Sequence, residues 1–73
     1  MTTTTTAQSH WLLAGGMSFQ IRVYRLQDRW YWTVLAEDHP FQHRGWHKGW
    51  HSAEAGFSAA TRYLEAQFGE VEP

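Results

Sequence analysis

The chain has 73 residues, a net charge of −1 and no cysteine, and aromatic residues make up 16% of it. This length allows one domain, and the lack of cysteine excludes disulfides, thiolate metal sites and cysteine nucleophiles. No apolar run approaches the roughly 20 residues of a membrane span, so we expect a soluble cytoplasmic protein without a membrane contact, whose core depends on aromatic side chains.

The first predicted region is a flexible N-terminal tail over residues 1–16. It opens with a threonine run that has no apolar periodicity and offers nothing to pack. Residues 9–14 are apolar enough to touch the domain, but Gly15 and Gly16 end this stretch quickly. A single domain is then expected over residues 17–69.

Residues 18–26 form the first predicted strand, because apolar and polar side chains alternate along them. Phe19, Ile21 and Val23 share one face, and the side chains between them share the other. This is the pattern of a half-buried strand. The short polar segment over residues 27–29 suits a hairpin connection.

Residues 30–36 form the second predicted strand, since they are rich in residues that favour β-structure. Trp30 and Trp32 share one face, and Tyr31 and Leu35 share the other. Both faces are therefore apolar, which indicates a central strand or a strand whose outer face is occupied.

The third predicted extended segment covers residues 41–51, after a turn at Pro40. It contains a small tandem repeat, Gly-Trp-His-Lys followed by Gly-Trp-His-Ser. In an extended strand these residues alternate between two faces, of which one is flat and basic and the other nearly bare backbone with imidazole. The basic face would carry Arg44, Trp46, Lys48 and Trp50.

The chain then shows helical signals. Ser52 suits an N-cap, and Glu54 lies in the first turn, where the helix dipole favours a carboxylate. Gly69 is a natural end to the helix, and residues 70–73 are predicted to be a frayed tail. Apolar residues at helical spacing form one buried stripe, namely Ala53, Phe57, Ala60, Leu64 and Phe68. The prediction is an α+β fold of the order β-β-β-α, a three-stranded antiparallel sheet with one C-terminal helix packed on one face.

A resemblance covers residues 29–68. The aromatic strand Trp30-Tyr31-Trp32-Thr33-Val34 is followed by Gly49 and by Ser52-Ala53-Glu54 at the start of a helix. This order resembles the small β-β-β-α domains of the HicB antitoxin type and is similar to the short bacterial domains related to YegP, which implies the same fold. The size and build are also similar to those of phage-encoded inhibitors of bacterial defence, the anti-CRISPR proteins.

Aromatic and basic residues of the predicted sheet are the candidate binding residues. Trp, Tyr and Arg dominate protein interfaces, and aromatic faces between cations also bind single-stranded nucleic acid. A third interpretation is that Trp46 and Trp50 pack under the helix as core. The predicted partner-binding residues are Arg22, Tyr24, Tyr31, Arg44, Trp46, Lys48 and Trp50.

The positions of the histidines and carboxylates give little support for a metal site or a catalytic site. His39, His43, His47 and His51 recur every fourth residue, but in a strand such neighbours lie about 13 Å apart, too far for one metal ion. No triad, phosphate loop or paired-carboxylate arrangement stands out. We therefore expect no metal, no cofactor and no catalytic residue.

The predicted function is a small non-enzymatic protein-binding module, an inhibitor or regulator of a host complex encoded by a phage or mobile element. The alternative is a single-stranded nucleic-acid-binding module that uses the same aromatic and basic face. A homodimer formed through the exposed aromatic strand is a third possibility. Salt separates the first two, because phosphate contacts weaken steeply as salt rises.

Overall fold

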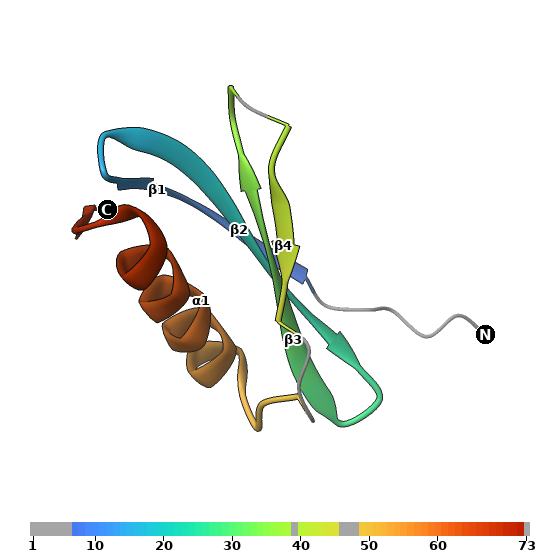
Figure 1. The fold of residues 1–73 in the computed structure, drawn as a ribbon. Helices are drawn as coiled ribbons and strands as arrows, with labels where there is room; N and C mark the ends of the chain where they lie inside the picture. The colour runs from blue at the N-terminus through green and yellow to red at the C-terminus, as the bar shows by residue number, and fades with distance from the viewer. Residues whose placement is uncertain (1–6, 39, 46–48, 73) are drawn as a thin grey trace.

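The structure is a computed structural model that describes residues 7–38, 40–45 and 49–72. Figure 1 shows a twisted antiparallel sheet with one helix lying against one face. The sheet has five strands in the order β4-β3-β2-β1-β5. The elements are β1 (Ala7–Ala14), β2 (Met17–Leu26), β3 (Arg29–Ala36), β4 (Gln42–Arg44), α1 (Ala53–Phe68) and β5 (Val71–Glu72).

The α+β class, the antiparallel sheet and the single C-terminal helix confirm the coarse prediction, but the number of strands was wrong. The predicted tail over residues 1–16 contains β1, and the predicted tail over residues 70–73 contains β5. Gly15 and Gly16 have φ angles of 57° and 81° and turn the chain directly from β1 into β2. Two such glycines are the signal of a two-residue hairpin loop rather than the end of a tail.

The core lies between α1 and the face of the sheet that packs against it. Phe19, Ile21 and Val23 of β2 are fully buried there, which confirms the predicted alternation of residues 18–26. Of the predicted helical stripe, Ala60 and Leu64 are fully buried, whereas Ala53, Phe57 and Phe68 are half-buried and pack against the core. Trp32 of β3 is only 5% exposed and also lies on this face. We call the face of the sheet that packs against α1 the covered face.

The predicted ends of α1 are confirmed. The Ser52 hydroxyl accepts a hydrogen bond from the backbone N–H of Ala55 at 3.1 Å, which satisfies one of the free donors of the first turn. Gly69 has a φ of 112°, and its N–H donates to the carbonyl of Glu65 at 3.1 Å. Glycine reaches such a φ without a steric penalty, so the helix ends where the sequence predicted.

The segment after β3 differs from the predicted strand over residues 41–51. Among its described residues, this segment pairs with β3 as a ladder through Gln42–Arg44 and then by an isolated bridge between Trp50 and Trp30. Gly45 lies against the indole of Trp32, so closely that a Cβ at Gly45 would be 2.3 Å from the Trp32 Cε2 atom. The strand ends at the point where this close approach begins.

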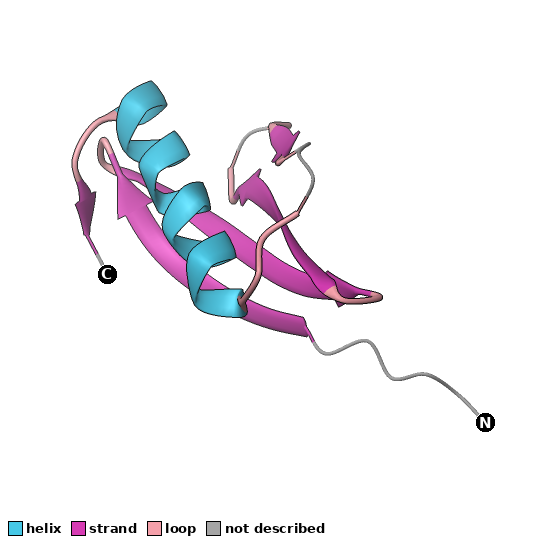
Figure 2. Cartoon of the chain, turned by 90° about the horizontal axis from the view of Figure 1, so that it is seen from below, coloured by secondary structure: helices cyan, strands magenta, loops and turns pink. Residues whose placement is uncertain are grey.

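Figure 2 shows α1 lying across the sheet on one side. In the described ranges, no helix or strand lies over the opposite side of the sheet (Figures 1 and 2). Among the same residues there is also no helix long and apolar enough to span a membrane.

Candidate functional site

The candidate site is the side of the sheet that faces away from α1, which we call the uncovered face. The pairing registers decide which residues share it, because directly paired residues of neighbouring strands point to the same side. The uncovered face includes Ser9, Trp11, Leu13, Ser18, Gln20, Arg22, Tyr24, Leu26, Arg29, Tyr31, Thr33, Leu35, Gln42, Arg44 and Glu72.

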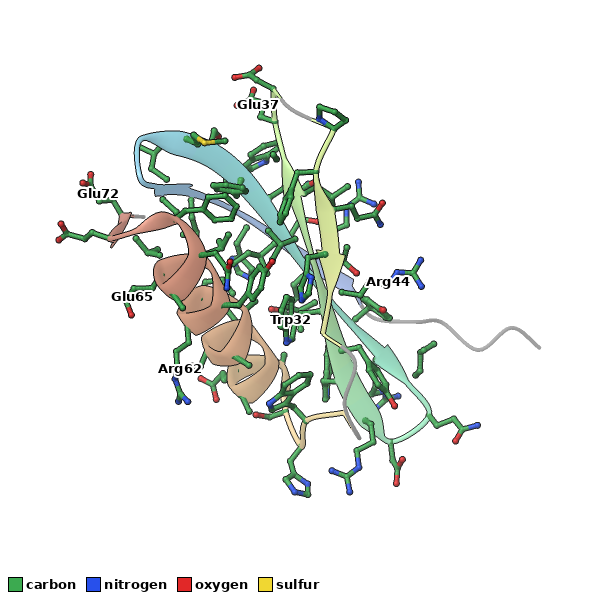
Figure 3. The ribbon with its side chains drawn as sticks, in the orientation of Figure 1. Trp32, Glu37, Arg44, Arg62, Glu65 and Glu72 are labelled. Atoms are coloured by element: carbon green, nitrogen blue, oxygen red, sulfur yellow. The ribbon has the colours of Figure 1, made fainter. Side chains whose placement is uncertain are left out.

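One row of this face crosses four strands. Ser9 pairs with Arg22, Arg22 pairs with Thr33, and Thr33 pairs with Arg44. At about 4.8 Å between neighbouring strands, the Cα atoms of the two arginines lie roughly 10 Å apart across Thr33. Figure 3 shows the Arg44 side chain directed away from α1, whereas Trp32 lies between the sheet and α1. The row thus presents two cations on one surface.

The two arginines border a shallow hollow of about 430 Å³ on the uncovered face. Thr33 lies between them and is only 7% exposed, although no described element covers this face, because the side chains around it shield it. Arginine presents several N–H donors in a planar fork that matches a carboxylate or a phosphate. The lining residues are Arg22, Tyr24, Leu26, Thr33, Leu35, Gln42 and Arg44. The lining of the hollow therefore combines two charged side chains with aliphatic, aromatic and polar ones.

A tyrosine pair lies next to this row. Tyr24 and Tyr31 pair directly across β2 and β3, and their ring centroids are 6.1 Å apart at an interplanar angle of 27°. Such a cross-strand aromatic pair stabilises the hairpin by a fraction of a kcal/mol up to about 1 kcal/mol. It also provides a flat aromatic surface beside the arginines.

Large apolar side chains are exposed on the uncovered face, both at the border of the hollow and beyond it. Trp11 is 55% exposed, Leu26 is 51% exposed and Leu13 is 42% exposed. Trp11 and Leu13 also border a second, smaller hollow of about 230 Å³. Trp11 and Leu13 are neighbours near the β1–β2 turn, whereas Leu26 lies at the other end of β2, so exposed apolar side chains flank the arginine row on both sides. Exposed apolar groups bordered by polar residues are typical of interaction surfaces.

The structure brings four of the seven predicted binding residues together. Arg22, Tyr24, Tyr31 and Arg44 share the uncovered face and lie in adjacent rows of it. Trp46 and Lys48 lie outside the described residues.

Trp50 lies elsewhere. It exchanges two backbone hydrogen bonds with Trp30, both of 2.8 Å, and its ring centroid is 6.1 Å from that of Trp32 on the covered face. The prediction that Arg44 and Trp50 share a face was therefore wrong. The reason is local, because β4 ends at Arg44 and Gly49, directly before Trp50, has a φ of 88° that is incompatible with an extended strand.

Trp50 belongs to an aromatic cluster at the edge of the core. Trp32 has ring neighbours in Trp50, in Tyr63 at 5.6 Å and in His43 at 5.7 Å. His43 in turn stacks on Tyr63 with ring centroids 4.1 Å apart and an interplanar angle of 5°. The interpretation of Trp50 as part of the core is the one that these contacts support.

The histidines are separated in space as well as in sequence. His43 stacks on Tyr63, whereas His51 is exposed before the helix, and His39 and His47 lie outside the described residues. His10, which the sequence interpretation did not use, packs on Phe57 at 4.6 Å. Over the described ranges, no group of three or more His, Cys, Asp or Glu side chains is placed to hold a metal ion.

Sequence reasoning missed three contributors to the uncovered face. Trp11 and Leu13 were assigned to a tail, although Leu12 and Ala14 alternate with them and are buried. The combination of this alternation with Gly15 and Gly16 was the available signal for a strand and a hairpin. Leu26 follows the same alternation as Arg22 and Tyr24 and could have been found from it.

Comparison with known proteins adds no assignment: no family model, no curated protein and no solved structure matches the chain. The resemblance to HicB-type domains therefore stays a prediction. The site has to be interpreted from its own residues.

Proposed function

We propose that the chain is a small non-enzymatic protein-binding module, an inhibitor or regulator of a host complex encoded by a phage or mobile element. It binds its partner through the uncovered face. The observation that carries the proposal is the exposure of Trp11, Leu13 and Leu26 on the same surface as two arginines that border a hollow. Such a surface combines an apolar area with the residue types that dominate interface hot spots.

The chemistry of the partner follows from the arginine row. Arg22 and Arg44 lie on either side of Thr33, so a carboxylate above Thr33 can accept hydrogen bonds from one or both guanidinium groups. The apolar side chains around the hollow favour aliphatic or aromatic neighbours of that carboxylate. We therefore propose a partner protein that presents an acidic residue within an apolar surface. The absence of cysteine is compatible with a reducing cytoplasm, where we place this contact.

The residue types of the hollow support binding rather than catalysis. Its described lining holds arginine, tyrosine, leucine, threonine and glutamine side chains, without a carboxylate or an imidazole. General acid–base chemistry near neutral pH is most often performed by histidine, aspartate or glutamate. The lining can hold a charged group in place, which is what a binding surface needs.

Single-stranded nucleic acid is the second candidate. The observation that favours it is the pair Tyr24 and Tyr31 beside the two arginines, since bases stack on aromatic rings and phosphates contact arginine. The aliphatic side chains of the same surface favour a protein instead, because leucine offers no stacking plane. The net charge of −1 also favours a protein.

The test is an affinity capture from host-cell lysate, performed with and without nuclease. A protein that is retained after nuclease treatment, and whose retention changes little with salt, supports the proposal. Capture that disappears with nuclease contradicts it. In that case the binding constant for a single-stranded oligonucleotide should fall as the salt concentration rises. The slope of its logarithm against the logarithm of the salt concentration should be about −1.4, if each of the two arginines neutralises one phosphate.

A further inference from the structure

The two edges of the sheet differ in how well they are protected. One edge is β4, which has three residues, ends in Arg44 and follows Pro40 closely. At the other edge, β5 pairs with β1 only at Leu13 and Ala14. Within the described part of the chain, the rest of β1 has no strand on the side that faces away from β2. Among the described residues, this is the longest free edge of the sheet.

The backbone of this edge is oriented for a further strand. The two-residue turn at Gly15 and Gly16 makes Ala14 and Met17 a hydrogen-bonded pair, so even-numbered residues of β1 bond to β2. Odd-numbered residues then direct their N–H and C=O groups outward, and the bond from the Gly15 N–H to the Glu70 carbonyl on that side agrees with this. Ser9 and Trp11 thus present donors and acceptors at the edge.

Devices that prevent edge association are missing from β1. Natural edge strands are usually blocked by charged side chains, proline, a bulge or short length. β1 has eight residues, pairs with β2 in an unbroken register, and contains neither a charged residue nor a proline. An edge of this kind adds a strand readily.

We propose that the strand that adds to this edge is β1 of a second copy, in an antiparallel pair with a two-fold axis at Ser9. The same edge on both copies satisfies the symmetry of a two-fold dimer. This centre puts Gln8 of one copy opposite His10 of the other, which is a donor and acceptor pair. Leu13 and Ala14, which β5 already pairs, lie beyond the contact.

The surroundings of the edge are compatible with this arrangement. A hollow of about 290 Å³ lies between β1 and the first half of α1, beside Gln8, His10 and Phe57, and gives room for side chains of the added strand. Because β1 is uncharged, two copies meet there without like charges on the axis. The dimer also joins two uncovered faces into one surface with Trp11 of each copy near the axis.

The test places charge on the axis. Ser9→Lys and Ser9→Glu each put like charges directly opposite one another in a homodimer, which should weaken association by about tenfold or more. A mixture of the two variants should instead form the heterodimer, because the charges are then opposite. Gln42→Lys on the β4 edge is the matched control and should associate like the unaltered chain. Sedimentation velocity distinguishes a monomer of 8.5 kDa from a dimer of twice that mass.

Hydrogen exchange of the unaltered chain gives a readout that needs no variant. The amides of Ser9 and Trp11 should gain protection as the protein concentration rises, whereas those of Gln42 and Arg44 should not. A chain that stays monomeric at every concentration overturns the proposal, and so does association that both Ser9 variants leave unchanged. A foreign strand captured at this edge by a monomeric chain also overturns it. The proposed protein-binding function does not depend on this dimer.

Discussion

Both faces of the sheet carry large apolar side chains, but these side chains have opposite relations to solvent. On the covered face, Phe19 is fully buried and Trp32 is nearly so beneath α1. On the uncovered face, Trp11 and Leu26 keep about half of their surface exposed. The chain has a single helix in its described part, and this helix can cover one face only. The chain therefore has more large aromatic and aliphatic side chains than its core contains, and the remaining ones are exposed on the uncovered face.

The comparison assigns stability to the covered face and binding to the uncovered face. Burying a large apolar side chain completely contributes about 1.5–3 kcal/mol to stability. A side chain that stays half exposed contributes only part of that free energy. A small domain has little stability to spare. Substitutions on the two faces should therefore separate loss of folding from loss of binding.

The largest expected effect is on the covered face. Leu64→Ala removes a fully buried side chain of α1 and should lower the free energy of unfolding by about 2–5 kcal/mol, because a cavity remains under the helix. The matched change Leu26→Ala, on the uncovered face, should cost less than about 0.5–1 kcal/mol. Urea unfolding followed by circular dichroism measures both. Equal losses for the two leucines would break the comparison.

Two glycines that face the core should respond with opposite signs. A Cβ at Gly45 would lie 2.3 Å from the Trp32 ring, so Gly45→Ala should destabilise by about 1–3 kcal/mol through overpacking. At Gly56 the nearest atom, Cγ1 of Val23, would be at an ordinary 3.5 Å. Gly56→Ala should therefore stabilise by up to about 1 kcal/mol, since alanine is the better helix former. Thermal unfolding of both variants checks the two signs, and a loss at Gly56 would mean that the helix packs more tightly than described.

A smaller effect is expected at the start of α1. Ser52→Ala removes the hydroxyl that accepts from the Ala55 N–H and should cost about 1 kcal/mol. Ser58→Ala, at an exposed helical position, is the control and should be neutral or slightly stabilising. The comparison of their unfolding midpoints isolates the cap, and equal midpoints would show that the hydroxyl contributes nothing.

The smallest expected effect is a gain in the turn that joins β2 to β3. Gln27 has a φ of 59°, in a region that costs a residue with a Cβ roughly 1–2 kcal/mol. Gln27→Gly should recover part of this cost, about 0.5–1 kcal/mol after the greater entropy of unfolded glycine is included. A rise in the melting temperature without a change in the spectrum of the folded state is the expected result, and a fall would contradict it.

Local patterns predicted the covered face well. The alternation of Phe19, Ile21 and Val23 and the helical stripe ending at Phe68 indicate burial directly, because one buried face imposes its period on the sequence. The capping residues Ser52 and Gly69 also act within one turn of the chain. These features depend on residues that are close together in the chain, so they can be predicted from one sequence.

Features that depend on pairing between distant segments could not be predicted in the same way. Arg22 and Arg44 share a row only because β2 and β4 both pair with β3 in a particular register. Trp50 lies on the covered face because Gly49 has a φ of 88° directly before it and because Trp50 pairs with Trp30. Such contacts are decided by tertiary packing, and the alternation of a glycine-containing segment does not determine them.

The central claim, that the uncovered face binds the partner, is tested most directly by two matched charge reversals. Arg22→Glu changes the uncovered face, and Arg62→Glu makes the same change on α1, whose Arg62 side chain points away from the sheet (Figure 3). Both arginines are exposed, so both variants should fold with the stability of the unaltered chain. The account predicts that Arg22→Glu loses nuclease-resistant protein capture and that Arg62→Glu keeps it. Full capture by a folded Arg22→Glu variant, or loss through Arg62→Glu, would contradict the account.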